Sequence, residues 1–257
     1  MPGKLEGKVA LVTGASTGIG KAAAFLFSKQ GAKVVVNARS EDKLKGVADE
    51  IKASGGDVAI VVGDVSKEAD CKKMVEVAVE TFGGLHVAFN NAGVFMAAPF
   101  SEITEDMASK VFDINLKSLV FCFKYQIPAM AKSGNKGSII VNSSSVASRT
   151  SALPFVTGNG VYAASKAGAD MLMKYAAIEG GSSGVRVNSI APGHVETPIY
   201  GPMTHDQLTE LTKTTQIIAR PIEPEEIAKL VLFLASDDAA MVTGSVYNMD
   251  GGWTIKA

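Results

Sequence analysis

Short runs of apolar, often β-branched residues alternate along the chain with longer stretches in which apolar residues recur at helical spacing. A short apolar run between turn residues is typical of a buried strand, and the longer period is typical of an amphipathic helix. The runs that predict strands lie at residues 8–12, 33–37, 58–62, 87–90, 138–142, 185–190 and 245–248. The stretches that predict helices lie near residues 18–29, 41–53, 67–82, 105–131, 161–179 and 224–235.

This alternation predicts an α/β fold, with a doubly wound, seven-stranded parallel sheet covered by helices on both faces. No linker rich in Pro, Gly or Ser divides the chain, so residues 1–257 are expected to form a single domain. Residues 198–221 are the least regular stretch and follow the sixth predicted strand. Because ligands bind beyond the carboxyl ends of the strands in such sheets, we expect this stretch to form a small lid or substrate insert.

Composition narrows the class of protein. The chain is 47% apolar and 20% charged with a net charge of −1, which indicates a globular protein rather than a disordered one. The lack of a basic run argues against nucleic acid as a partner. The apolar runs are too short to span a membrane, and the N-terminus has no apolar signal core, so neither a membrane nor secretion is expected. The cytoplasm is the expected location.

Cysteine and histidine spacing gives no sign of a metal site. Cys71 and Cys122 lie far apart in the sequence and indicate buried thiols in a reducing compartment. His86, His194 and His205 form no ligand-spaced pattern, so a zinc site is not expected.

Tyr162 and Lys166 are spaced so that both side chains lie on one face of a helix. A phenol is a poor acid near neutrality because its ordinary pKa is about 10. A lysine ammonium at about 4 Å favours the phenolate by roughly 4 kcal/mol, which would lower the phenol pKa by about 3 units. The pair therefore predicts a tyrosine acid or base that works near neutral pH, although an isolated pair of this kind also suits a surface helix.

A glycine-rich turn follows the first predicted strand and opens the first predicted helix. Glycines in such a turn let the backbone approach a pyrophosphate, and the helix N-terminus attracts the anion. The spacing is G-x-x-x-G-x-G rather than the G-x-G-x-x-G of many dinucleotide-binding enzymes, so a simple tight turn is the alternative. Its place at the first strand-to-helix turn favours a phosphate loop, whose residues are Gly14, Ser16, Thr17, Gly18, Ile19 and Gly20.

The end of the second predicted strand bears on the choice between NAD and NADP. Enzymes that use NAD often carry an acidic residue there to bind the ribose hydroxyls, whereas an arginine suits a 2′-phosphate. This chain has no acidic residue at that point, and Arg39 follows the strand at once. A guanidinium binds phosphate through two parallel hydrogen bonds, so we predict NADP(H) as the preferred cofactor, with NAD(H) as the alternative.

Taken together, these features resemble the short-chain dehydrogenase/reductase family from about residue 5 to residue 253. The family's motifs occur in order: the glycine-rich turn, Asp64-Val65, Asn90-Asn91-Ala92-Gly93, Asn115-Leu116-Lys117-Ser118, Ser144-Ser145, Tyr162 to Lys166, and Pro192-Gly193-His194-Val195-Glu196-Thr197. The resemblance implies a Rossmann fold, a nicotinamide cofactor and no metal. It is strongest to the NADP(H)-preferring branch of carbonyl reductases and 3-oxoacyl reductases.

The resemblance also implies which residues bind the cofactor. Asp64 and Val65 would contact the adenine, and Tyr162 and Lys166 would lie at the nicotinamide ribose. Asn91, Ala92 and Gly93 would line the cofactor beside the fourth strand. The nicotinamide wall would consist of Pro192, Gly193, Val195 and Thr197, with Thr197 bonding the carboxamide.

The resemblance implies a catalytic set of Asn115, Ser145, Tyr162 and Lys166. Among the three consecutive serines, strand alternation places Ser143 and Ser145 on the same side, and only the motif register selects Ser145. The segment from Ser145 to Tyr162 is about four residues longer than is usual in the family. We expect this lengthened loop, at residues 149–160, to border the active site and to influence the choice of substrate.

The resulting hypothesis is an oxidoreductase that transfers a hydride between NADP(H) and a carbonyl or secondary alcohol. Ser145 would orient the carbonyl, Tyr162 would deliver the proton, and Asn115 would hold a water that links Lys166 to solvent. An alcohol, sugar or steroid dehydrogenase working oxidatively is the alternative, and a cofactor-binding regulator without catalysis is a third. The family buries long apolar helices between subunits, so a homotetramer is expected.

Several other side chains are candidates for the substrate pocket, although most also suit the core. His194 lies inside the loop predicted to face the nicotinamide and is a candidate for substrate contact. The apolar candidates are Phe95, Met96, Phe155, Tyr200 and Trp253.

Overall fold

The computed structural model describes residues 2–134, 137–150 and 158–256. At its centre is a seven-stranded parallel sheet with the strand order β3-β2-β1-β4-β5-β6-β7. The strands are β1 (Val9–Thr13), β2 (Lys33–Ala38), β3 (Val58–Val62), β4 (Val87–Asn90), β5 (Ser138–Asn142), β6 (Arg186–Pro192) and β7 (Val246–Met249). The parallel sheet predicted from the sequence is therefore confirmed, with strand ends that differ by no more than two residues.

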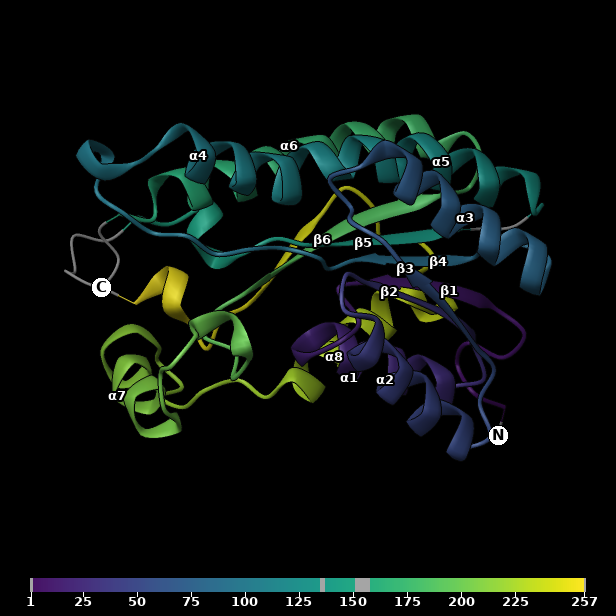
Figure 1. The fold of residues 1–257 in the computed structure, drawn as a ribbon, viewed down its shortest axis with the longest axis horizontal. Coiled ribbons are helices and arrows are strands. Elements are labelled where there is room, and N and C mark those ends of the chain that lie inside the picture. Colours follow the sequence, from purple (N-terminus) through teal and green to yellow (C-terminus); the bar gives the residue numbers. More distant parts are fainter. Residues whose placement is uncertain (1, 135–136, 151–157, 257) are drawn as a thin grey trace.

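Two layers of helices cover the sheet (Figure 1). One layer consists of α1 (Gly18–Lys29), α2 (Glu41–Ala53) and α8 (Pro224–Ala235). The opposite layer consists of α3 (Glu68–Phe82), α4 (Glu105–Phe112), α5 (Ser118–Lys132) and α6 (Gly160–Gly181). This doubly wound arrangement buries both faces of the sheet, which explains why the strands read as continuous apolar runs rather than alternating ones.

The hydrophobic core is divided by the sheet into two clusters. Phe27 and Phe89 are fully buried between the sheet and the α1, α2 and α8 layer, whereas Met74 and Ile139 are fully buried on the α3, α5 and α6 side. Each large side chain that is removed from water contributes about 1.5–3 kcal/mol. The two clusters hold the strands firmly enough to position the loops at the carboxyl ends.

One predicted helix is interrupted in the structure. Residues 105–131 were expected to form a single helix, but a π-helical segment at Asp113–Lys117 separates α4 from α5. Such a bulge shifts the side chains around it relative to a regular α-helix, and bulges of this kind are frequent at functional sites. The bulge contains Asn115, which is 3% exposed.

Residues 198–221 contain a helix that the periodicity did not predict. The helix α7 (His205–Thr215) begins with a capping box, in which Thr204 accepts from the backbone of Gln207 and the Gln207 side chain accepts from the backbone of Thr204. The pattern Thr-x-x-Gln at this point is a sequence signal for a helix start. In Figure 1, α7 lies apart from the two helical layers, beside the end of the chain.

Strand order reverses between β1 and β4, which are neighbours in the sheet but not in the sequence. The chain leaves β1 toward α1 on one face and leaves β4 toward the other face. A crevice opens at such a switch point, beyond the carboxyl ends of the strands, and ligands of doubly wound folds bind there.

Candidate active site

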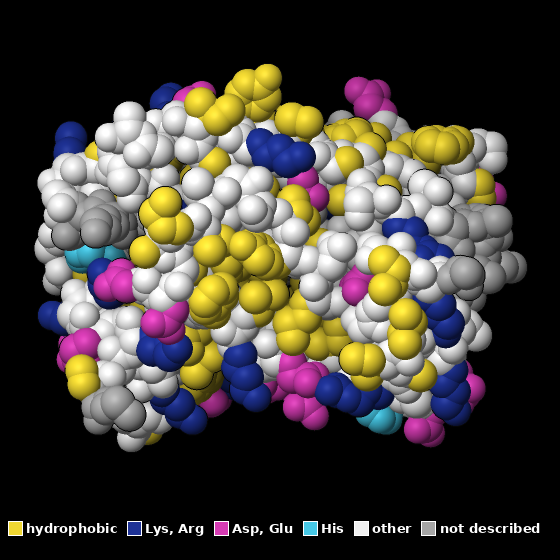
Figure 2. All heavy atoms as spheres, turned by 180° about the vertical axis from the view of Figure 1, so that it is seen from behind, with side chains coloured by type: hydrophobic (Ala, Val, Ile, Leu, Met, Phe, Trp, Pro, Cys, Tyr) yellow, Lys and Arg dark blue, Asp and Glu magenta, His cyan; other side chains and the backbone are white. Residues whose placement is uncertain are grey.

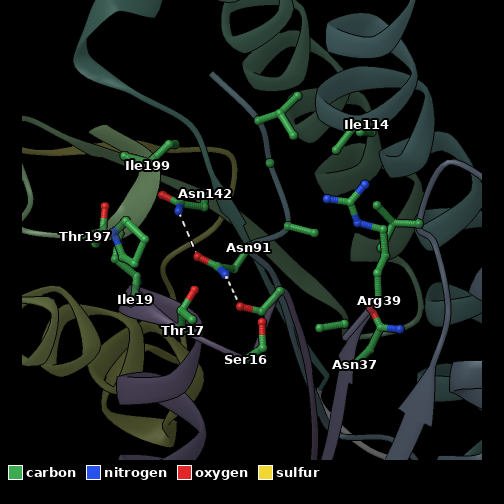
Figure 3. A pocket seen from close by; sticks show the side chains of 18 of the residues that line it. Ser16, Thr17, Ile19, Asn37, Arg39, Asn91, Ile114, Asn142, Thr197 and Ile199 are labelled. Atoms are coloured by element: carbon green, nitrogen blue, oxygen red, sulfur yellow. Dashed lines mark hydrogen bonds between the residues drawn. The ribbon is translucent and has the colours of Figure 1, made fainter. Parts of the chain in front are cut away.

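A cavity of about 430 Å³ occupies this crevice. Figure 3 shows Arg39 near one end of it and Thr197 and Ile199 at the other, with Asn91 and Asn142 between them. The cavity is elongated along the carboxyl ends of the strands. Its shape suits an extended ligand that has one end near Arg39 and the other near Thr197 and Ile199.

The glycine-rich turn forms the floor of this cavity. Gly14 and Gly18 have φ of +64° and +54°, a conformation that strongly favours glycine. A Cβ at Gly14 would lie 2.9 Å from the Ala92 Cα, and one at Gly20 would lie 2.3 Å from the Gly14 carbonyl oxygen. Gly14, Ser16, Thr17, Gly18 and Ile19 line the cavity, whereas Gly20 is buried beneath the turn and serves close packing.

The N-terminus of α1 opens toward the cavity at this turn. Thr17 is its N-cap residue, and among the described residues its side chain makes no capping hydrogen bond. The first N–H groups of a helix have no partner within the helix and attract anions. A phosphate-bearing group therefore fits here, because the backbone can approach it closely and the helix end favours its charge.

A hydrogen-bond network ties the turn to the neighbouring strands. The Asn91 Nδ2 donates to the carbonyl oxygens of Thr13 and Gly14, at 3.0 and 3.2 Å. The Asn142 Nδ2 donates to the Asn91 Oδ1 at 2.9 Å (Figure 3), and the Thr13 Oγ1 accepts from the backbone of Asn91 and Ala92. The predicted cofactor residues Asn91 and Ala92 thus line the cavity and also hold the ends of β1, β4 and β5 together.

Positive and negative groups meet at the Arg39 end of the cavity. Arg39, Ser40 and Lys43 line it from the β2 side, and Asp64 and Val65 line it from the β3 side. Burial favours a raised pKa for the Asp64 carboxyl, but hydrogen bonds from Ser66 and the charge of Arg39 bring that pKa below its ordinary value. Asp64 is therefore ionised at neutral pH.

Tyr162 and Lys166 lie one turn apart on α6 and both border the cavity, as their spacing predicts. The Lys166 Nζ donates to the Asn142 carbonyl oxygen at 2.6 Å and lies 5.8 Å from the centre of the Tyr162 ring. The residue Lys166 as a whole is buried, with 4% of its surface exposed. The two side chains therefore sit close together in a protected environment.

The predicted lowering of the Tyr162 pKa is wrong for this structure. Burial raises the pKa of the Tyr162 phenol to about 12, although a hydrogen bond with Ser144 acts in the opposite direction. Burial also lowers the pKa of Lys166 to about 8, an effect that the nearby Asp170 carboxylate opposes. The free energy of removing both groups from water outweighs the attraction between them, and four-residue spacing alone does not reveal this burial.

The three consecutive serines have different surroundings. Ser143 and Ser144 line the space beside Tyr162, and the Ser144 hydroxyl lies within hydrogen-bonding range of the phenol. Ser145, which the motif register selects, is fully buried, and its Oγ donates to the Pro192 carbonyl oxygen at 2.6 Å. Ser144 therefore faces the space beside Tyr162, whereas the hydroxyl of Ser145 is occupied by the Pro192 carbonyl oxygen.

Asn115 connects the loop after β4 to α6. Its Oδ1 accepts from the Val94 backbone at 2.8 Å, and its Nδ2 donates to the Val94 carbonyl oxygen and the Ser165 Oγ. The Ser165 Oγ in turn donates to the Tyr162 carbonyl oxygen at 2.7 Å. A Cβ at Gly93 would meet the Asn115 Oδ1 and the Lys166 Nζ, both at 3.4 Å, so the three residues converge.

A smaller, largely apolar pocket of about 200 Å³ adjoins the cavity at Tyr162. The Phe95 ring packs edge-on against the Tyr162 ring, with centroids 5.1 Å apart. The predicted wall residues line this pocket, and only Thr197 also lines the larger cavity: Pro192, Gly193, Val195 and Thr197. Residues 198–221 contribute Ile199, Tyr200, Met203 and Leu211 to it.

Several site residues were not predicted from the sequence. Thr13, Asn142 and Ser144 each make contacts that organise the site, and their place at or just beyond the carboxyl ends of β1 and β5 was the signal that could have identified them. Of the apolar candidates, Phe95, Tyr200 and Trp253 line the smaller pocket. Phe155 and most of the lengthened loop lie outside the described residues.

The two cysteines are close in space although they are distant in the sequence. Both thiols are free and buried, with their sulfur atoms 3.9 Å apart between α3 and α5. Within residues 2–134, 137–150 and 158–256, no cluster of His, Cys, Asp and Glu side chains could hold a metal ion. The helices of the same residues include none that is long and apolar enough to cross a membrane.

Comparison with known proteins gives matches over nearly the whole chain. The family model described as enoyl-(acyl carrier protein) reductase matches residues 14–254. Cyclohexanol dehydrogenase of Acinetobacter sp. (strain SE19) is 39% identical over 257 residues, which cover 100% of this chain and 98% of that protein. The 2,5-dichloro-2,5-cyclohexadiene-1,4-diol dehydrogenase of Sphingobium indicum is 40% identical over 256 residues, covering 99% of each chain.

Solved structures give the same result. A short-chain type dehydrogenase/reductase from Mycobacterium marinum superposes with a TM-score of 0.92 at 32% identity, covering 98% of this chain and 97% of that one. The fold, the glycine-rich turn at the switch point and the relatives agree, and the enzymes of this group use a nicotinamide cofactor to act on alcohol or carbonyl groups. The chain belongs to the short-chain dehydrogenase/reductase family.

Proposed function

We propose that the protein is an NADP(H)-dependent oxidoreductase that reduces a carbonyl group to a secondary alcohol. The observation that carries this proposal is that Tyr162 borders both the elongated cavity and the smaller apolar pocket. A cofactor in the first and a substrate in the second would meet at its hydroxyl. A proton donor is needed at that meeting point when a hydride is transferred to a carbonyl carbon.

The preference for NADP(H) is supported by the Arg39 end of the cavity. Arg39 and Lys43 line this end, and no acidic residue stands at the end of β2. A guanidinium recognises phosphate through paired, charge-assisted hydrogen bonds, and the lysine adds a second positive charge. Asp64 is ionised, and it lies on the β3 side, where it is suited to the adenosine part of the cofactor.

The Arg39→Ala variant tests this preference. Loss of a charged, bidentate phosphate contact should lower kcat/KM for NADPH by about tenfold or more and leave kcat/KM for NADH nearly unchanged. Lys45→Ala is a matched control, because Lys45 is an exposed cation on α2, the helix that follows Arg39, and pairs with Glu41. A native enzyme that prefers NADH would refute the assignment.

The residues around Tyr162 suggest how the chain would act on a carbonyl. When bound, the nicotinamide supplies the hydride. Tyr162 would deliver the proton to the carbonyl oxygen, and its pKa of about 12 keeps the phenol protonated at neutral pH. Lys166 would hold the ribose and contribute positive charge beside the phenol, anchored by its bond to the Asn142 carbonyl oxygen. Asn115 would keep the loop after β4 and the start of α6 in register.

A serine hydroxyl would orient the carbonyl oxygen and stabilise the charge that develops on it. Family resemblance assigns this role to Ser145, whereas Ser144 is supported by its place in the pocket beside Tyr162 and by its effect on the phenol pKa. Ser145 reaches the same region only if its Oγ turns away from the Pro192 carbonyl. The two assignments make different predictions for the single alanine variants of Ser144 and Ser145.

Oxidation of a cyclic secondary alcohol is a second candidate function. Two relatives are named for cyclohexanol and for a chlorinated cyclohexadiene diol. The pocket of about 200 Å³ beside Tyr162 is compact and largely apolar, which suits a ring of this size. Comparing kcat/KM for cyclohexanol with NADP⁺ or NAD⁺ against cyclohexanone with NADPH or NADH separates the two directions.

The Tyr162→Phe variant tests the chemistry itself. The change removes only the hydroxyl, so the protein should fold and bind NADPH while turnover falls by at least about a hundredfold. Cofactor binding is measured by quenching of the single tryptophan, and turnover by NADPH absorbance. Near-native kcat in this variant would exclude Tyr162 as the proton donor and favour a binding function.

We also propose that the protein is a cytoplasmic homotetramer. Met171, Tyr175 and Ile178 are 53%, 61% and 74% exposed on α6, although such side chains are usually covered. Figure 2 shows hydrophobic side chains gathered in the middle of one face of the molecule. Sedimentation equilibrium should give four times the 26.7 kDa chain mass. A monomer would refute this assembly.

A further inference from the structure

His194 lines the smaller pocket, and contacts with several residues fix its side chain. The residue is 5% exposed and lines the pocket together with Tyr162. Its ring stacks on Trp253, with centroids 4.5 Å apart and an angle of 26° between the planes. Its Nδ1 lies 3.1 Å from the Tyr200 hydroxyl, and its backbone N–H donates to the Gln216 Oε1. These contacts hold the imidazole in one orientation.

The protonation of this ring follows from its neighbours. Burial lowers the pKa of His194 to about 4, so the ring is neutral at working pH and carries one N–H. The Tyr200 oxygen lies within range of the Val195 backbone N–H, which leaves it free to donate its own proton. The His194 Nδ1 lies 3.1 Å from this oxygen. A proton donated by Tyr200 to Nδ1 would leave the ring proton of the neutral imidazole on Nε2.

The Nε2 has no hydrogen-bond partner among the described residues, and it is shielded from bulk water. A buried donor without a partner costs about 1–3 kcal/mol, so such groups commonly have a functional explanation. The surface of the pocket that His194 lines is mainly apolar, and its lining includes Phe95, Leu211 and Met203. The unbranched Met203 side chain is 40% exposed and can repack to admit a ligand atom.

We propose that the Nε2–H group of His194 recognises a second oxygen atom of the substrate. The favoured substrates would then be compact, largely apolar molecules that carry a hydroxyl or carbonyl oxygen in addition to the reacting one. A polar donor at a fixed point of a largely apolar pocket orients a ligand, because few placements of the ligand satisfy it. This inference rests on the proposed function, since it takes Tyr162 as the group at the reacting oxygen.

The test compares substrates that differ only in the second oxygen. NADPH oxidation is followed with cyclohexanone, cyclohexane-1,2-dione and cyclohexane-1,4-dione for the native enzyme and three variants. His194→Phe keeps a stacked ring but lacks the donor, and His194→Gln keeps an N–H. His205→Phe is the matched control, because His205 is exposed and pairs with Glu196.

We expect the native enzyme to favour at least one dione over cyclohexanone by about tenfold in kcat/KM, the usual effect of one hydrogen bond. His194→Phe should lose this preference, so that the ratio of kcat/KM for the dione to kcat/KM for cyclohexanone falls by about tenfold. His194→Gln should retain part of the preference, and His205→Phe should retain all of it.

Results that contradict the role of His194 can be told apart from results that contradict the proposed function. Equal turnover of cyclohexanone and both diones by the native enzyme would overturn the inference and leave the proposed function intact. An equal loss on all three ketones in His194→Phe would show that the ring acts only in packing. The lack of any NADPH oxidation with the three ketones would count against the proposed function itself, and the inference would fall with it.

Discussion

The buried neutral imidazole of His194 makes stability depend on pH in a calculable way. The ring is 5% exposed, and burial lowers its pKa from 6.5 to about 4. Between these two values the unfolded chain binds a proton that the folded chain does not bind. Because stability rises with pH wherever the unfolded state binds more protons, stability should fall as pH drops through this window.

The size of the effect follows from the two pKa values. One pKa unit corresponds to about 1.4 kcal/mol, so the full difference is about 3 kcal/mol once the pH is below both values. By about pH 5 the unfolded state is almost fully protonated at this site and the folded state is not, which already lowers the free energy of unfolding by about 2 kcal/mol relative to about pH 7.

The assay is urea unfolding of the native protein and His194→Phe at about pH 7 and about pH 5, followed by far-ultraviolet circular dichroism. Phenylalanine keeps the stack on Trp253 and does not titrate. The native protein should lose about 2 kcal/mol more than the variant over this range, whatever their difference at neutral pH. His205→Phe, an exposed control, should behave like the native protein. Equal losses in the native protein and His194→Phe would refute the burial of a neutral imidazole.

Three further predictions concern the chemistry and the turn. If Ser144 orients the carbonyl, Ser144→Ala should lower kcat by about a hundredfold with little effect from Ser145→Ala, and the reverse result would support the motif register. Because the pKa of Tyr162 is raised to about 12, alcohol oxidation should accelerate steadily from about pH 7 to about pH 9, while carbonyl reduction stays nearly constant; parallel profiles would contradict this assignment. Gly20→Ala should destabilise the protein by about 1–3 kcal/mol in thermal unfolding, because the new Cβ would lie 2.3 Å from the Gly14 carbonyl oxygen, and unchanged stability would show that the turn relaxes.

Local signals along the chain predicted much of the fold. Strands β3, β4 and β5 begin and end at the predicted residues, because parallel strands covered by helices read as mainly apolar runs between turn residues. The helix expected over residues 105–131 was wrong at its centre, where the π-helical segment interrupts it. Periodicity does not reveal such a bulge, since it is stabilised by contacts that Asn115 makes with distant Val94 and Ser165.

Some features of the candidate site could likewise be predicted from the sequence, and others depend on the tertiary structure. By itself, the sequence determined most of the elements, the glycine-rich turn after β1, the pairing of Tyr162 with Lys166 on one helix and the family, because each depends on residues that are close in the chain or on motif order. Only the tertiary structure decided the direction of the Tyr162 pKa shift, the different surroundings of Ser144 and Ser145, and the lack of a partner for the His194 Nε2 among the residues that the structure describes. These properties depend on burial and on contacts between segments far apart in the chain, which local pattern does not contain.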